Sequence, residues 1–233
     1  MARTEVTLSQ WAAVMGTRPN DCEYGCDDAH PVSRVSWNEA CEYADRLTNL
    51  ENEVRQRQDQ PPLSSCYVRE RDTWAWPAAN RKCTGYRLPT EAEWEYFADI
   101  DAKTLYFFGD DPKLMCDFGN VFDETAKGAG ILNAKTSVET PFYDCVDGYA
   151  YLAPVGSFAF NRWGLFDGQG NVGEQVWDRE AQGGDSRVLR GSDFNDPIMT
   201  HRASDRRVIA PSDRRVDVGF RVVRSAVGQV SQG

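Results

Sequence analysis

The sequence contains no apolar run that approaches the roughly 20 residues of a membrane-spanning helix. Residues 1–5 include no apolar signal region, so we expect nothing in the chain as written to target or anchor it. Internal repeats, low-complexity tracts and linkers are also absent, and 233 residues are enough to bury a real core. We therefore expect one domain over residues 1–233 with no membrane span.

Positive charge is in short supply. Lys and Arg together number 26 against 36 Asp and Glu, which gives a formal net charge of −10. A surface of this sign repels phosphate groups, so we expect no nucleic-acid partner. The acidic balance fits a soluble chain or one that binds cations, although arginines gather near the C-terminus.

Histidine is scarce, with only His30 and His201 in the chain. A zinc site would need two closely spaced cysteine pairs or additional histidines. A Ser-His-Asp arrangement could be drawn from His201, Asp205 and a serine, but a lone histidine in an arginine-rich loop is more often a packing residue. The composition therefore gives little support to either kind of site.

Cysteine occurs in an odd number, seven. Proximity in the sequence favours the disulfides Cys22–Cys26, Cys66–Cys83 and Cys116–Cys145, with Cys41 left free within a helix. Such bridges would indicate an oxidising compartment, so we expect a secreted or periplasmic location. Because connectivity cannot be read from sequence, reduced buried thiols in a cytosolic protein are the alternative.

Capping boxes predict three helices in the first half of the chain. In each box a Ser or Thr side chain and a Glu or Gln three residues later cap the first turn. The boxes begin at Thr7, Ser36 and Thr90. The third helix should bury Trp94 together with Phe97 or Ala98.

Two stretches are predicted to be irregular. Residues 51–80 are polar and then carry Pro and Trp, so we expect a long excursion there rather than a helix or strand. After residue 99, Gly, Asn, Asp and Pro recur every few residues, and residues 218–224 alternate well enough to form a terminal strand. Long loops in a compact domain are usually functional or held by metals and disulfides.

The stretch at 164–174, Gly-Leu-Phe-Asp-Gly-Gln-Gly-Asn-Val-Gly-Glu, is the most informative part of the chain. Its glycines let carbonyl oxygens turn inward, and Asp167 and Glu174 add two hard anionic ligands. A loop of this composition is suited to a calcium site. A tight surface turn is the alternative.

Several motifs follow one another in a recognisable order. The most specific is Arg-Leu-Pro-Thr-Glu-Ala-Glu-Trp-Glu at 87–95, and the others lie at 5–7, 31–37, 153–158, 164–174, 190–192 and 219–221. Together they resemble the formylglycine-generating enzyme family, also called sulfatase-modifying factors, over nearly the whole chain. The resemblance implies a single, loop-rich α+β domain with a variant of the C-type-lectin-like fold.

The resemblance also implies one or two structural calcium sites, whose expected ligands are all hard oxygen donors. The alternative is that these glycine- and acid-rich turns simply cap themselves. The first site would use the Asp167 side chain, the Gly170 and Val172 carbonyls and the Glu174 side chain, and the second would use Asn120, the Val121 carbonyl, Asp147 and the Tyr149 carbonyl.

Two departures from the family pattern matter. Family members usually have a further strand before the block that matches 5–7. We therefore expect either a shortened gene or an absent opening strand, which would leave a sheet edge to be covered. They also hold a copper ion with two cysteines between the blocks that match 190–192 and 219–221. Here no cysteine follows Cys145. Thiolates are the ligands that hold copper(I), so we expect neither copper nor catalysis of the family's type.

The segment 191–217 matches residues that line the binding cleft in the family and contact ligands in variable proteins of this fold. It mixes apolar residues with arginines and acids, although Arg206, Arg214 and Arg221 could instead pair with acids to hold the loops. We expect a non-catalytic, calcium-stabilised module that recognises a protein or other ligand through this surface. A copper-dependent oxidase that converts cysteine to formylglycine is the alternative. The expected contact residues are Asp193, Phe194, Asn195, Asp196, Ile198, Met199, Thr200, His201, Arg207, Ile209 and Arg215.

Overall fold

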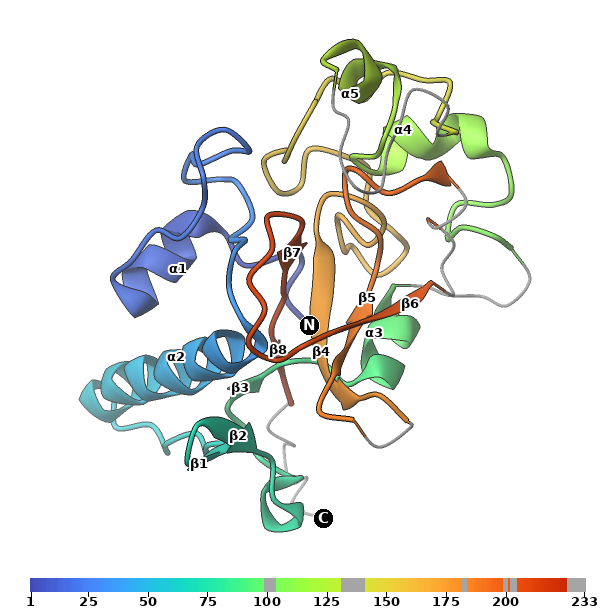
Figure 1. The fold of residues 1–233 in the computed structure, drawn as a ribbon. Coiled ribbons are helices and arrows are strands. Elements are labelled where there is room, and N and C mark those ends of the chain that lie inside the picture. The colour runs from blue at the N-terminus through green and yellow to red at the C-terminus, as the bar shows by residue number, and fades with distance from the viewer. Residues whose placement is uncertain (99–103, 131–140, 182–183, 199–200, 202–204, 226–233) are drawn as a thin grey trace.

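The computed structural model describes residues 1–98, 104–130, 141–181, 184–198, 201 and 205–225. Helices α1 (Leu8–Met15) and α2 (Trp37–Arg57) precede a four-stranded sheet with the order β6-β5-β4-β7 (Figure 1). Trp37 stacks on Arg187 of β5, and Trp94 of α3 (Glu91–Phe97) lies against Arg190 of the same strand. Side chains three residues apart on a strand point to opposite faces, so α2 and α3 cover opposite faces of β5.

All three predicted capping boxes are present. The side chains of Thr7, Ser36 and Thr90 each accept a hydrogen bond from a backbone amide three residues later, and the Gln or Glu there returns one. Of the two residues proposed beside Trp94, it is Ala98 that is buried. These helix starts could be predicted because every group that forms them lies within four residues of sequence.

The prediction of an irregular excursion over 51–80 is wrong. Helix α2 continues to Arg57, a hairpin follows with β1 (Val68–Glu70) antiparallel to β2 (Thr73–Ala75), and the 3-10 turn η1 (Ala78–Asn80) ends the region. The last turns of α2 have few apolar residues but carry Glu-to-Arg pairs four residues apart, 51 with 55 and 53 with 57. Such pairs support an exposed helix without an apolar stripe.

The terminal strand is split into two. Strand β7 (Val218–Gly219) runs parallel to β4 (Gly173–Arg179), whereas β8 (Val223–Arg224) is antiparallel to β3 (Tyr86–Arg87). Between them, the carbonyls of Phe220 and Val222 accept hydrogen bonds from the amides of Val6 and Ala2 at 2.9 and 2.8 Å. Through these hydrogen bonds, residues 2–6 cover the backbone edge formed by residues 220–222.

The second half of the chain is mostly loops between short elements, as predicted. These elements are η2 (Pro112–Leu114), α4 (Met115–Phe118), α5 (Glu124–Gly128), β5 (Arg187–Arg190) and β6 (Arg206–Ile209). The three predicted disulfides are all present, and Cys41 is free and fully buried in α2.

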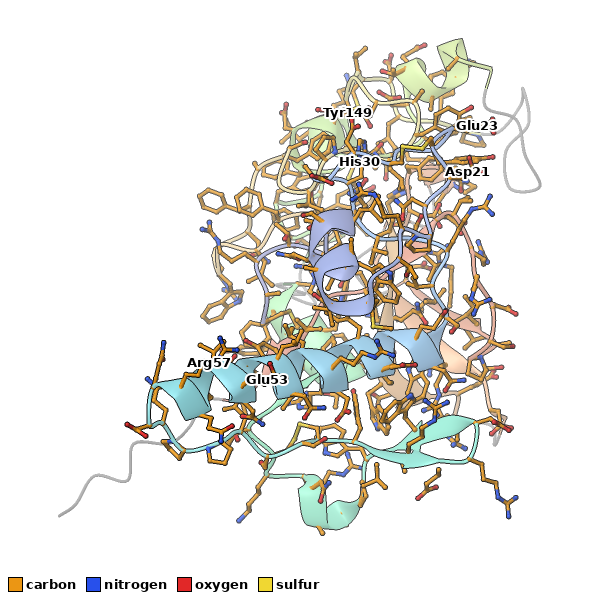
Figure 2. All side chains as sticks on the ribbon, turned by 90° about the vertical axis from the view of Figure 1, so that its left-hand side faces the viewer. Asp21, Glu23, His30, Glu53, Arg57 and Tyr149 are labelled. Atoms are coloured by element: carbon orange, nitrogen blue, oxygen red, sulfur yellow. A yellow bond between two sulfur atoms is a disulfide. The ribbon has the colours of Figure 1, made fainter. Side chains whose placement is uncertain are left out.

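The largest hydrophobic cluster lies around α1 and α2 and contains the stacked rings of Trp11 and Tyr43 with Phe220. Figure 2 shows α2 between α1 and the β1–β2 hairpin, with Glu53 and Arg57 on its exposed side. None of the helices in the described residues is both long and apolar enough to cross a membrane.

Candidate functional site

Asp167, the first residue of the first predicted calcium set, is buried in the loop before β4. Its backbone is left-handed, with φ at 56°, and its Oδ2 accepts a hydrogen bond from the amide of Gly156 at 2.7 Å. Its Oδ1 is buried with no described donor bonded to it, and the side chain within hydrogen-bonding reach of the Asp167 carboxyl is that of Glu5, another carboxyl. A buried oxygen without a partner is costly, so this position fits a proton or a cation.

Gly170 brings this loop into contact with Asn120, which belongs to the second predicted set. Its φ is 86°, and a Cβ built there would lie 2.2 Å from the carbonyl oxygen of Asn120. The next amide, of Asn171, donates to that same carbonyl at 2.8 Å. Only glycine allows this approach, which places the backbones of the two predicted sets side by side.

Glu174 acts as the counter-ion of a buried arginine. Its Oε1 and Oε2 lie 2.9 and 2.7 Å from Nε of Arg221, and Nε1 of Trp94 donates to Oε2 at 2.7 Å. The two charged side chains are almost completely buried, and the carboxylates around Arg221 raise the pKa of its guanidinium despite the cost of burial. Any cation held by Glu174 would have to share its carboxylate with Arg221.

Glu5 completes this cluster and was not identified from the sequence as a candidate. Its side chain is 1% exposed, Oε1 accepts from Nδ2 of Asn171 at 3.1 Å, and Oε2 is buried without a partner among the described residues. Burial and the neighbouring Asp167 raise the pKa of Glu5 well above its usual value, and burial also raises that of Asp167. Three carboxylates therefore surround one guanidinium, which leaves a formal excess of two negative charges inside the protein. A divalent cation would offset both charges, whereas a single proton would offset one.

The second predicted set is assembled around Asp147. Its Oδ2 accepts from the amide of Val121 and its Oδ1 from the amide of Tyr149, both at 2.8 Å. Asn120 is fully buried, and its Oδ1 has no partner within the described part of the chain. Burial raises the pKa of Asp147 to about 7, with the negative charge of Asp123 adding to the effect. Residues 120–121 and 147–149 are thus brought together from two separate loops, and the Oδ1 of Asn120 is the unsatisfied oxygen.

Asp123 lies beside Asp147 and was also missed. Its Oδ1 caps α5 by accepting from the amide of Ala126 at 2.9 Å, and its Oδ2 accepts from the amide of Asp147 at 2.6 Å. Ligand atoms of Asp123, Asp147 and Cys116 lie within 4.8 Å of one another. Because the sulfur of Cys116 is bonded to Cys145, only the two carboxylates could serve a metal.

Asn171 links the two predicted sets. Its Oδ1 accepts from Nδ2 of Asn120 at 3.0 Å, and its Nδ2 donates to Glu5. The same Oδ1 accepts from the amide of Ala153 at 2.9 Å. One buried side chain therefore connects the N-terminal segment with both loops.

Most of the residues predicted to contact a ligand in the 191–217 segment lie inside the protein. The prediction that they form an exposed surface is wrong for six of them. Ile198, Arg207 and Arg215 are half-buried, and Met199 and Thr200 lie outside the described residues. The exposed positions are instead Arg206, Val208 and the loop after β6. The six buried residues are Asp193, Phe194, Asn195, Asp196, His201 and Ile209.

Arg207 explains why so polar a segment can be buried. Its Nη1 lies 2.9 Å from Oδ2 of Asp193 and 2.8 Å from Oδ2 of Asp196, and these carboxylates raise the pKa of its guanidinium above the usual range despite the cost of burial. His201 is fully buried near this group, and burial lowers its pKa to about 4. The two acids and the arginine neutralise one another's charges, so these side chains can be buried away from solvent. Composition alone could not reveal this pairing.

Thiol chemistry has a single candidate, Cys41. Six cysteines are bonded in pairs, and Cys41 is fully buried, which raises the pKa of its thiol well above the usual value. A buried thiol with a raised pKa is a poor nucleophile and a poor metal ligand. It lies in α2, on the side of the sheet away from α3.

Comparisons with known proteins agree with this geometry. A family model described as a sulfatase-modifying factor enzyme 1-like domain matches residues 1–226. The chain is 29% identical to the chaperone protein LppX of Paenibacillus barcinonensis over 97% of its own length and 79% of that protein. It is 28% identical to the formylglycine-generating enzyme of Thermomonospora curvata over 82% of its length, and 32% identical to the inactive C-alpha-formylglycine-generating enzyme 2 of Mus musculus over 65%.

The chain spans about half the length of those last two relatives, 54% and 48% respectively. Among solved structures, Treponema denticola variable protein 1 superposes with a TM-score of 0.65 at 23% identity, over 94% of this chain and 81% of that one. CarF gives the same TM-score at 25% identity, over 96% and 85%. These likenesses confirm the predicted α+β fold.

Proposed function

The chain belongs to the sulfatase-modifying factor enzyme 1-like domain family, and we propose that it is a non-catalytic member that binds a protein partner, with calcium stabilising its loops. The observation that carries the proposal is the state of the cysteines. The family's oxidation depends on two thiolates that bind copper, but here the only free thiol in the chain is Cys41, buried in α2. The mouse relative described as inactive gives a precedent within the family.

Calcium is supported by the unsatisfied oxygens of the two acidic clusters. Glu5 and Asp167 would hold one ion with the carbonyls of Gly170 and Val172, while Glu174 shares its carboxylate with Arg221. Asn120 and Asp147 would hold a second with the carbonyls of Val121 and Tyr149. Calcium takes six to eight oxygen ligands and tolerates irregular geometry, so it suits donors of this type. Bound there, it would offset the excess negative charge inside the protein.

The exposed face of β6 is the part of the 191–217 segment that supports partner binding best. Arg206 and Val208 point outward, and Val208 is 41% exposed. Strand β6 also forms one end of the four-stranded sheet, and no described strand pairs with its outer edge. An extended segment of a partner could add to such an edge through backbone hydrogen bonds. The relative named as a chaperone makes a client polypeptide the natural partner class.

Site-specific photo-cross-linking tests this surface. A photoreactive amino acid replaces Val208 in one variant and Val54 of α2 in the other, because the two valines are similarly exposed at 41 and 46%. In cells that make the protein, we expect a discrete cross-linked polypeptide from position 208 and not from position 54, lost when calcium is chelated. Equal cross-linking at both positions, or cross-linking that chelation leaves unchanged, would contradict the proposal.

A further inference from the structure

Arg187, the first residue of β5, is buried without a carboxylate partner. Four arginines in the described part of the chain are buried, and Arg187 is 3% exposed. No described carboxylate lies within ion-pair distance of it. Each of the other three has such a partner: Arg87 pairs with Glu93, Arg190 with Glu95 and Arg221 with Glu174. A buried charge usually has a counter-ion, so Arg187 is an exception that calls for an explanation.

Aromatic rings hold the guanidinium of Arg187 in place but leave most of its donors unused. Its Cζ lies 3.6 Å from the ring centroid of Trp37 and 5.4 Å from that of Trp177. Nη1 donates to the carbonyl of Trp177 at 3.0 Å, and Nε is buried without a partner. A guanidinium has five N–H donors, and stacking satisfies none of them. Burial, with the positive charge of Arg179 adding to it, lowers the pKa of Arg187 to about 10.

Two adjoining pockets, of about 370 and about 360 Å³, meet at Arg187. Both lie between the β1–β2 hairpin and the ends of β4 and β5, and they share Glu70, Thr73, Arg179 and Arg187 as lining residues. The second is walled by three tryptophans, Trp74, Trp76 and Trp177. Each volume is within the range of small-molecule sites. This end of the molecule is opposite to the one that carries Tyr149 (Figure 2).

The turn of the hairpin contributes a second cation. Arg71 and Asp72 form a two-residue hairpin loop, in which the φ of 53° at Arg71 is a usual geometry. Arg71 is exposed and lines the first pocket together with Arg187.

We propose that these joined pockets bind a monocarboxylate carried on an aromatic group, with the carboxylate on Arg187 and the ring among the tryptophans. The site shares no residue with the cation clusters and adjoins the loop after β6, whose Pro211 lines the first pocket, so it extends the proposed function. A carboxylate forms paired hydrogen bonds with a guanidinium, and an aromatic ring packs against the edges of indoles whose faces already carry Arg81, Arg87 and Tyr67. Exposed carboxylates of Glu70, Asp72 and Asp185 line the rim, so a doubly charged phosphate would be repelled more than a single carboxylate.

Two probes that differ only in charge test the assignment. N-acetyl-L-phenylalanine carries the carboxylate, and N-acetyl-L-phenylalaninamide lacks it. Because neither probe contains indole, quenching of the fluorescence of the protein's seven tryptophans reports binding, and the Arg187 variants assign that binding to the pocket. We expect the acid to bind about tenfold or more tightly than the amide, as a charge-assisted pair predicts. Inorganic phosphate should not displace it.

Variants locate the effect at Arg187. Arg187→Met should weaken binding of the acid about tenfold or more while leaving binding of the amide unchanged. Arg187→Lys keeps the charge and should retain part of the preference. Arg57→Met is the matched control, since Arg57 also forms an exposed pair, with Glu53 at the end of α2, and lines neither pocket. It should change the affinity less than threefold or so.

Stability separates a binding arginine from a structural one. If Arg187 serves ligand binding, the Arg187→Met variant should melt at the same temperature as the parent protein or higher, because the substitution removes an unpaired buried charge. Arg190→Met, which strips the partner from Glu91 and Glu95, should melt lower. Equal affinity for acid and amide, displacement of the acid by phosphate, or failure of the parent protein to bind the acid at its solubility limit would each overturn the proposal. These three outcomes are measured on the parent protein, so they remain decisive if the Arg187→Met variant does not fold.

Discussion

Replacing Glu5 by Gln should change stability in opposite directions with and without calcium. The cluster of Glu5, Asp167 and Glu174 around Arg221 has an excess of buried negative charge, and Oε2 of Glu5 has no described partner. In chelator the folded protein relieves this excess by keeping a proton on Glu5, whose pKa burial raises well above its usual 4.5. Gln is the neutral isostere of that protonated form. Its oxygen can still accept from Asn171.

The sign and size of the effect follow from proton linkage. Above pH 4.5 the unfolded chain releases the Glu5 proton while the folded protein retains it, so the free energy of unfolding falls as pH rises toward the folded pKa. The slope is at most about 1.4 kcal/mol per pH unit, or about 2.7 kcal/mol between pH 5.5 and 7.5. For a chain of this size, that corresponds to roughly 5–10 °C in melting temperature. Glu5→Gln should remove this slope in chelator and be as stable as the parent or more so at neutral pH.

In excess calcium the same substitution should destabilise. An ion that binds only the folded state adds about 2.7 kcal/mol when its concentration is a hundred times its Kd. Loss of the Glu5 ligand should remove much of that gain. The assay is thermal unfolding of parent and variant from pH 5.5 to 7.5, in chelator and in calcium.

Glu23→Gln is the matched control for this experiment. Glu23 is exposed on the loop before His30 (Figure 2), so its replacement should stay within about 0.5 kcal/mol of the parent in every condition. Parallel pH profiles for the parent and Glu5→Gln in chelator, or the same loss of stability with and without calcium, would refute the reasoning.

Three further predictions can be checked on the same protein. Asp147→Asn should be more destabilising in calcium than in chelator, by up to about 2.7 kcal/mol when calcium is a hundred times its Kd. In chelator one of the two backbone amides bonded to the carboxylate loses its acceptor, but the substitution also removes a buried carboxyl whose pKa burial raises to about 7, so the two effects oppose each other; equal costs by thermal unfolding in both conditions would argue against an ion at this site. Burial lowers the pKa of His201 from 6.5 to about 4, so the free energy of unfolding should fall by up to about 1.4 kcal/mol per pH unit as the pH falls from 6.5 to 4. His201→Gln should flatten that slope in urea titrations, and an unchanged slope would contradict the prediction. Alkylation in denaturant without reductant, followed by mass spectrometry, should label Cys41 alone, and labelling of more than one cysteine would contradict the three disulfides.

What could be predicted from the sequence is what local signals encode. The capping boxes at Thr7, Ser36 and Thr90 are complete within a few residues, and each disulfide joins cysteines that are neighbours in the cysteine order. The end of α2 has few apolar residues, and its signal in the sequence is the Glu-to-Arg spacing of four residues. The hairpin after it has only three residues in each strand.

The candidate sites depend on contacts between distant parts of the chain. Glu5 meets Asp167 and Asn171 only because the N-terminal segment follows the edge formed by residues 220–222. Phe194 is buried between Asp193 and Asp196 of its own loop, and Arg207 of β6 neutralises both acids. Motif order predicted which loops matter, but not which of their side chains reach solvent.

Oxidation of a cysteine peptide tests the central claim most directly. The protein is incubated with a cysteine-containing sulfatase-type peptide, copper and reductant, with the Thermomonospora curvata formylglycine-generating enzyme as the positive control, and the peptide mass is followed. We predict that the peptide remains unconverted, because the chain offers no pair of accessible thiolates for copper. Formation of the aldehyde over many turnovers by this chain would contradict the binding-module account.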